Sequence, residues 1–141
     1  MRVSLRHLAP GELDHELIWL SVSVASAAAI SSWLALHLPW PACVFRALTG
    51  LPCVTCGATR ASYALLHGHA SIAWRLNPLA TLALGAVAVF DLYAAAVLLA
   101  RLPRVRIGFR SLADRRAVCA LLFAAALLNW AYLLRSGLLG R

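Results

Sequence analysis

Residues 43–61 read CVFRALTGLPCVTCGATRA, and the rest of the chain is organised around them. This segment contains three of the four cysteines, namely Cys43, Cys53 and Cys56. Long apolar stretches lie before and after it, and no other part of the sequence places thiol groups at so close a spacing. We therefore expect the chemistry of the protein in this segment, which we call the cysteine segment. The apolar stretches around it determine its position relative to a membrane.

The apolar stretches predict three helices that cross a membrane. Hydrophobic residues make up 62% of the 141 residues. Charged residues make up only 13%, against about 25% in average soluble proteins. A helix needs about 20 mainly apolar residues to cross the hydrocarbon core of a bilayer, and the stretches at about 17–38, 78–100 and 117–134 meet this requirement. We predict a single all-α integral membrane domain over residues 1–141, with the cysteine segment between the first and second spans.

The arginines predict the orientation of these spans. All thirteen basic residues are arginine, and the formal net charge is +8. Six of them lie between the second and third spans, whereas the loop that contains the cysteine segment has three. Because arginine-rich loops stay in the cytoplasm, the N-terminus is predicted to be cytoplasmic and the cysteine segment to lie outside. The positive charge is thus attributed to membrane topology, and no nucleic-acid partner is expected.

The arginine-rich loop Arg101–Arg116 also predicts a lipid partner. Its arginines are interleaved with the apolar residues Val105, Ile107 and Phe109. This pattern suits a segment that lies on an anionic inner leaflet, where each arginine contributes about 1 kcal/mol of attraction. We expect this loop to contact membrane lipids.

Between the first two spans, the sequence predicts a turn and then short helices. The run Thr49-Gly50-Leu51-Pro52 is typical of turns, because glycine tolerates positive φ and proline fixes its own φ. Residues 58–67 show a helical pattern too short to cross a bilayer, and residues 70–74 add about one turn. These helices are expected at the interface or re-entrant between the spans. Asn77-Pro78 then starts the second span, with asparagine as N-cap and proline in the first turn.

The pair Cys53 and Cys56 favours thiol–disulfide exchange as one hypothesis. The pair precedes a predicted helix whose N-terminus favours a thiolate, and Arg60 adds a positive charge one turn later. Cys56 is closer to the first turn, so this hypothesis makes Cys56 the nucleophile and Cys53 the resolving thiol. An oxidising compartment outside the membrane would allow disulfides to form and persist.

Two other hypotheses use the same thiols. In a zinc site, Cys43, Cys53 and Cys56 bind the metal with His67 or His69 as the fourth ligand. In the simplest alternative, Cys43 forms a disulfide with Cys53 or Cys56 and closes a short loop, which contributes about 3 kcal/mol in the chain-entropy model. The fourth cysteine, Cys119, falls within the third apolar stretch and is interpreted as inert.

Asp91 lies near the middle of the second span, where an aspartate costs roughly 2.5–3.5 kcal/mol and needs a partner. Counting about 1.5 Å per residue from the predicted cytoplasmic ends places Asn129 about one turn from the depth of Asp91. We predict a buried hydrogen bond between the two side chains. The functional alternative is a proton or ion relay through Asp91.

The motif residues also show a family resemblance. The pattern consists of Cys43, Thr49-Gly50, Cys53-x-x-Cys56-Gly57-x-Thr59-Arg60-Ala61, His67-Gly68 and Asn77-Pro78-Leu79. It resembles a bacterial membrane-protein family known as domain of unknown function 2752. The resemblance implies a small multi-pass protein of the bacterial cytoplasmic membrane, with signature residues Cys43, Cys53, Cys56, Gly57, Thr59, Arg60 and Asn77. It implies no activity, and Val54 stands where the family usually has proline.

These observations favour a non-enzymatic accessory or structural component whose outer loop is held by a disulfide or a metal. Such a component would present Thr59, Arg60 and His67 to a membrane-protein partner or to a second copy of the chain. A membrane thiol–disulfide oxidoreductase and a structural zinc protein are the alternatives. The motifs of soluble enzymes do not occur in the sequence.

Overall fold

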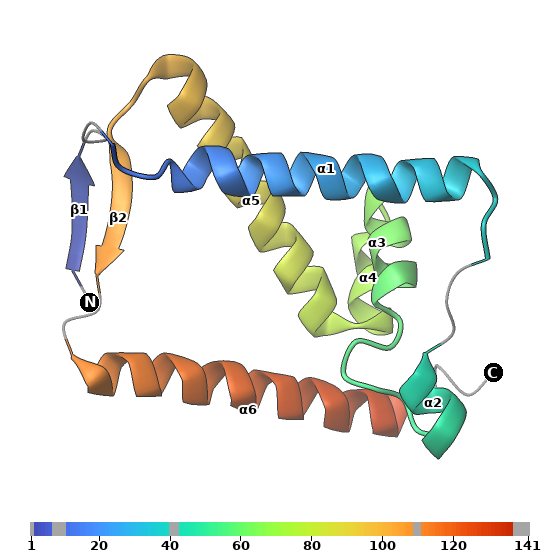
Figure 1. Cartoon of the computed structure of the whole chain (residues 1–141). Coiled ribbons are helices and arrows are strands. Elements are labelled where there is room, and N and C mark those ends of the chain that lie inside the picture. The colour runs from blue at the N-terminus through green and yellow to red at the C-terminus, as the bar shows by residue number, and fades with distance from the viewer. Residues whose placement is uncertain (1, 7–10, 40–42, 109–110, 137–141) are drawn as a thin grey trace. The chain divides into compact units, whose positions relative to one another are not determined.

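Three long helices dominate the fold. The computed structural model describes residues 2–6, 11–39, 43–108 and 111–136 (Figure 1). In this part of the chain, the helices α1 (His15–Ala35), α5 (Pro78–Ala100) and α6 (Leu112–Ser136) are long and apolar enough to cross a membrane. The predicted spans and the position of the cysteine segment between the first two are therefore confirmed. The third helix begins five residues earlier than predicted.

Side-chain caps start these helices, and one of them, Asn77, is the cap predicted from the sequence. The carboxylate of Asp14, the amide oxygen of Asn77 and the hydroxyl of Ser111 each accept a hydrogen bond from the backbone N–H three residues later, at 3.1, 2.9 and 3.1 Å. Each bond satisfies one of the N–H groups that have no partner inside the first turn of a helix.

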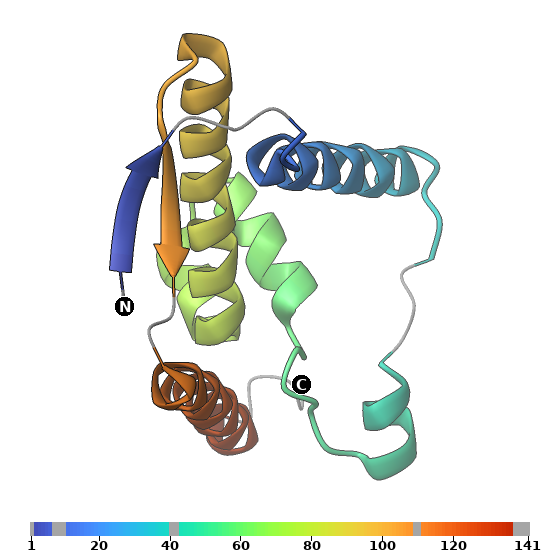
Figure 2. The same cartoon turned by 60° about the vertical axis from the view of Figure 1, so that its left-hand side comes forward.

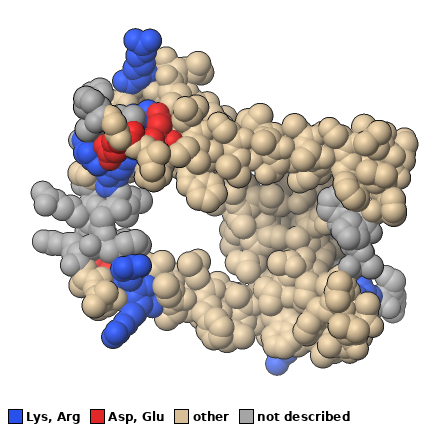
Figure 3. All heavy atoms as spheres, in the orientation of Figure 1, with Lys and Arg blue, Asp and Glu red and all other residues tan. Residues whose placement is uncertain are grey.

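The long helices expose most of their apolar side chains. Only 6%, 11% and 11% of the residues in the apolar windows of α1, α5 and α6 are buried within the described chain. Figure 3 shows that charged side chains gather near the two strands and the start of α6, while most of the visible surface is uncharged. A soluble monomer rarely exposes apolar patches of more than a few hundred Å². The exposed helix surfaces therefore indicate a small membrane protein with three spans.

Backbone contacts divide the chain into two compact units. The first, residues 1–40 and 86–114, contains the strands and is called the ribbon unit. The second, residues 41–85 and 115–141, contains the cysteine segment and is called the cysteine unit.

The ribbon unit contains a two-stranded antiparallel sheet that the sequence analysis missed. Strands β1 (Arg2–Arg6) and β2 (Arg104–Gly108) pair with Ser4 opposite Arg106 (Figure 2). The chain is mostly helical as predicted, and this short sheet is an element that the prediction did not contain. Arginine and apolar residues alternate in both segments, which favours strands. A strand also needs a partner, however, and here the partner lies about a hundred residues away in the sequence.

Ion pairs join the arginines of β2 to the residues before and within the first turn of α1. Arg104 pairs with Asp14 and with Glu16, and Arg106 Nη1 lies 3.1 Å from Glu16 Oε1. Glu16 is buried, with 3% of its surface exposed. These two arginines therefore face acidic side chains within the protein.

The predicted lipid contact now depends on the other arginines of this loop. Arg101, Arg115 and Arg116 are exposed. Phe109 and Arg110 lie outside the described residues. Contact between this loop and the inner leaflet stays a prediction.

The cysteine unit contains three short helices, α2 (Val44–Thr49), α3 (Ala58–Leu66) and α4 (Ala70–Leu76). The predicted helix at 58–67 and the turn at 70–74 are confirmed, whereas α2 was not predicted. α3 and α4 pack together through buried Ala61, Ala64 and Ala73. Their small side chains allow the two helices to approach closely.

Candidate thiol and metal site

Three sulfur atoms meet in the cysteine segment. Cys43 is the N-cap of α2, and Cys53 and Cys56 lie in the loop before α3. The Sγ atom of Cys53 lies 3.4 Å from Cys43 Sγ and 3.3 Å from Cys56 Sγ. All three sulfurs lie within 4.8 Å of one another, and the three thiols are free. The sequence prediction that these cysteines act together thus agrees with their geometry.

Tight turns fold the loop back onto itself. Cys56 N donates to Cys53 O, and Ala58 N donates to Thr55 O, both at 3.0 Å. Gly57 follows with a φ of 84°, a conformation that favours glycine, and it is the N-cap of α3. The same fold lets the backbone N–H of Cys53 donate to Cys56 Sγ at 3.1 Å. Such a donor favours a thiolate or a metal-bound sulfur at Cys56.

Asn77 holds the loop from the start of α5. Its side chain is 1% exposed, and Nδ2 donates to the backbone oxygens of Val54 and Cys56 at 3.1 and 3.0 Å. Its Oδ1 atom at the same time caps α5. One buried amide therefore starts the second span and positions the backbone that carries the cysteines.

The last turns of α6 hold the same loop from a second direction. Asn129 Nδ2 donates to Val54 O at 3.0 Å, and Trp130 Nε1 donates to Pro52 O at 2.8 Å. Leu133, one helical turn further, is 1% exposed and forms a buried apolar cluster with Cys56, against which Cys43 and Cys53 pack. The thiols therefore have an apolar side, and the carbonyls of the loop are satisfied by side chains of the third span.

The predicted partner of Asn129 was wrong. Its Nδ2 atom donates to Val54 O, and its Oδ1 atom accepts from Leu79 N at 3.1 Å. Neither bond involves Asp91. The depth estimate failed because α6 begins at Leu112, which moves Asn129 toward the far end of the span. Leu79 lies about 18 Å along α5 from Asp91, at about 1.5 Å per residue. Asp91 Oδ1 is buried without a hydrogen-bond partner among the described residues.

Cys53 and Cys56 do not ionise alike. Burial acts to raise the pKa of Cys53, but hydrogen bonds with Thr55, Cys56 and Cys43 outweigh it and lower the pKa to about 7. Burial and the adjacent Cys53 raise the pKa of Cys56 to about 11. The ionisation order is thus opposite to the prediction that Cys56 is the more reactive thiol.

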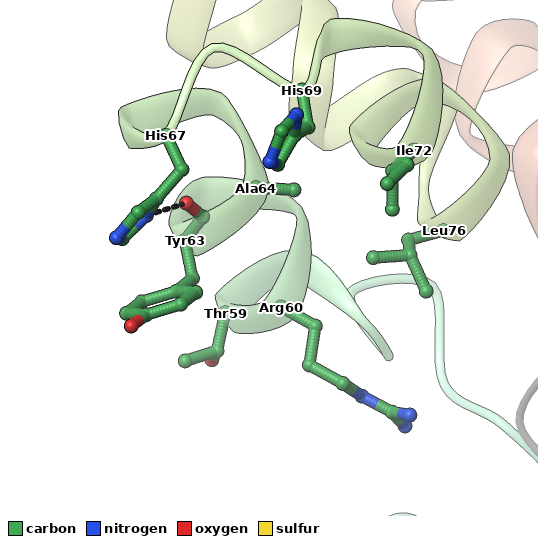
Figure 4. A pocket seen from close by; sticks show the side chains of 8 residues that line it. All are labelled: Thr59, Arg60, Tyr63, Ala64, His67, His69, Ile72 and Leu76. Carbon is green, nitrogen blue, oxygen red and sulfur yellow. Dashed lines mark hydrogen bonds between the residues drawn. The ribbon is translucent and has the colours of Figure 1, made fainter.

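The remaining motif residues lie outside the sulfur cluster. Thr49 Oγ1 donates to Phe45 O at 2.7 Å and accepts from Leu51 N at 3.2 Å, so it supports the turn at Gly50. His67 was considered as a metal ligand, but within the described ranges the group of close ligand atoms consists of the three cysteines. Its Nδ1 atom lies 2.9 Å from the carbonyl oxygen of Tyr63. Thr59, Arg60, His67 and His69 line a separate groove over α3 and α4 (Figure 4).

Sequence reasoning missed Trp130 and Leu133. A tryptophan near the end of a span is usually interpreted as an interfacial anchor. Here its indole N–H contacts the cysteine loop, and the sequence contains no local signal for a contact between residues this far apart.

Comparison with known families covers the same region. Residues 43–91 match the family model described as protein of unknown function (DUF2752). Over this segment the chain is similar to the DUF2752 family. The predicted resemblance is thereby confirmed over the cysteine segment, the short helices and the first part of α5. The DUF2752 match ends before α6, so Asn129, Trp130 and Leu133 support the DUF2752 cysteines from outside the matched segment. No curated protein and no solved structure matches the chain.

Proposed function

We propose that this small membrane protein is a non-enzymatic component whose three-cysteine loop is held by one Zn²⁺ ion. The observation that carries the proposal is the mutual distance of Cys43, Cys53 and Cys56, whose sulfurs all lie within 4.8 Å. Two sulfurs bound to one zinc at about 2.3 Å each lie no more than about 4.6 Å apart. Only small side-chain rotations separate this cluster from a three-thiolate site.

The surroundings of the thiols support a structural role for the metal. The site would connect the start of α2 to the loop before α3, and this loop is already tied to α5 and α6 by Asn77, Asn129 and Trp130. Leu133 covers the apolar side of the site. With three protein ligands, the fourth zinc position is left to water or to a ligand from a partner.

We place the protein in the bacterial cytoplasmic membrane, with its N-terminus in the cytoplasm and the cysteine loop outside. The arginine distribution supports this orientation. A membrane-protein partner or a second copy of the chain would complete the accessory role.

The test is the metal content and the free-thiol count of one detergent-purified sample prepared without reductant. We expect one equivalent of zinc, with one reactive thiol before and four after metal removal. Cys43→Ser should lose the metal. The matched control Cys119→Ser removes the exposed cysteine of α6 and should keep it. A sample without metal and with two thiols missing would replace the metal by a disulfide.

The lowered pKa of Cys53 favours a second function, thiol–disulfide exchange. In this scheme, the Cys53 thiolate attacks a substrate disulfide, forms a mixed disulfide and releases one substrate thiolate. The thiolate of Cys56 then attacks Cys53 Sγ, which releases the second substrate thiol and leaves a disulfide between Cys53 and Cys56. The roles are reversed relative to the sequence hypothesis, because Cys53 is the more acidic and the more exposed thiol.

Trapping experiments distinguish the second function from the first. If exchange occurs, Cys56→Ser should accumulate a mixed disulfide with a partner on non-reducing gels, while Cys53→Ser should not. If neither variant accumulates such a species, the exchange function is excluded.

A further inference from the structure

We propose that the groove over α3 and α4 binds the phosphate headgroup of an anionic phospholipid, with the acyl chain along its apolar wall. The groove is open and has a volume of about 490 Å³. In Figure 4, Ala64 lies at its centre, Ile72 and Leu76 of α4 form one side, and Arg60 lies at one end. The full lining consists of Thr59, Arg60, Tyr63, Ala64, His67, His69, Ile72 and Leu76.

The charge of the groove fits an anionic ligand. The guanidinium of Arg60 is exposed, and within the described ranges no hydrogen bond or ion pair engages it. The sequence contains no aspartate or glutamate from residue 17 to residue 90. The planar fork of an arginine binds phosphate through two parallel hydrogen bonds, and Thr59 is a further polar residue of the lining. An anion in this groove therefore meets donors and no like charge.

The position of the groove along the chain fits a lipid rather than a soluble anion. The helix α4 ends at Leu76, and the spanning helix α5 begins at Pro78. The hydroxyl of Tyr132, near the end of the spanning helix α6, donates to Arg75 O of α4 at 3.0 Å. Two spans therefore end at α4, which places it where the membrane meets water. Trp74 of α4 is 48% exposed, as is typical of residues at headgroup level.

The apolar wall supplies the second half of the recognition. Ile72 is 50% exposed and lies in the lining together with Leu76. A phosphate bound by Arg60 leaves the glycerol and the start of an acyl chain to cover these two side chains. This combination of one cation and an apolar wall fits an amphiphile better than inorganic phosphate. The groove shares no residue with the cysteine cluster, so the outcome of the metal measurement does not decide this proposal.

The test is native mass spectrometry of the purified protein in detergent with phosphatidylglycerol or phosphatidylcholine. We expect one tightly bound phosphatidylglycerol per chain. Arg60→Gln should weaken this binding at least about tenfold, because it removes a charged hydrogen-bond donor pair. The matched control is Arg75→Gln, which removes the same charge from α4 but does not line the groove, and it should change the affinity less than about twofold.

Three results would overturn the proposal. They are unchanged lipid affinity in Arg60→Gln, an equal loss in Arg75→Gln, and equal binding of both lipids by the wild type. A photoreactive residue in place of Ile72 checks the occupant directly. After illumination, the mass of the protein should increase by that of one phosphatidylglycerol. A cross-link to a second copy or to another protein would contradict the lipid assignment.

Discussion

The cysteine unit and the ribbon unit both connect parts of the chain that lie far apart in sequence, but they use different forces. In the cysteine unit, neutral side chains such as Asn77 and Asn129 donate to backbone carbonyls. In the ribbon unit, Arg104 and Arg106 pair with the buried carboxylate of Glu16. Neutral hydrogen bonds are insensitive to salt, whereas ion pairs depend on keeping both charges. The two attachments therefore differ in how far they depend on charge.

The strongest test of this comparison is Asn77→Ala. It leaves the carbonyl of Cys56 and the N–H of Ala80 without this partner, whereas the carbonyl of Val54 keeps Asn129. Each buried group that loses its hydrogen bond costs about 1–3 kcal/mol, so the free energy of unfolding should fall by roughly 4 kcal/mol. Thermal unfolding in detergent measures the change. The control Ser62→Ala removes only a bond from a hydroxyl to its own helix and should change little.

The corresponding test of the ribbon unit is Glu16→Gln. It keeps the shape of the side chain but leaves Arg104 and Arg106 without a buried carboxylate. Breaking a buried ion pair by removing one partner costs about 3–5 kcal/mol. We expect a loss near the lower end, roughly 3 kcal/mol, because Arg104 keeps Asp14. An equal melting temperature for variant and wild type would show that the ion pairs do not hold this unit.

A third test concerns the lowered pKa of Cys53. Cys53 has a pKa lowered to about 7, so its thiolate fraction should rise about tenfold between pH 6 and pH 8. The alkylation rate of metal-free Cys119→Ser should follow this rise. Cys56, with a pKa raised to about 11, should stay protonated over the same range. A rate that rises only above pH 8 would contradict the lowered pKa of Cys53.

The smallest expected effect is that of Trp130→Phe. The substitution keeps an aromatic ring in α6 and removes the N–H that donates to Pro52 O at 2.8 Å. One neutral hydrogen bond contributes about 1 kcal/mol, so we expect a loss of about that size. Phe90→Leu on α5 is a matched control for an aromatic residue that makes no such bond in the described chain. If Trp130→Phe is as stable as the wild type, the contact from α6 to the loop is not important for stability.

Local signals in the sequence predicted several elements correctly. Asn77 acts as the expected cap, since a cap interacts with a backbone group only three residues away. Gly50 has the expected positive φ of 72°. The strands β1 and β2 were missed because their pairing depends on a distant partner.

By itself, the sequence determined the three apolar helices, their caps and the spacing of the cysteines. These features depend on hydrophobicity and on contacts between near neighbours, which any short segment contains. Only the tertiary structure decided that Asn129 and Trp130 of α6 hold the cysteine loop, that Glu16 is buried between two arginines, and that Cys53 is the acidic thiol. These properties arise where residues far apart in the chain meet, because hydrogen bonding, burial and pKa depend on the surroundings that distant segments create.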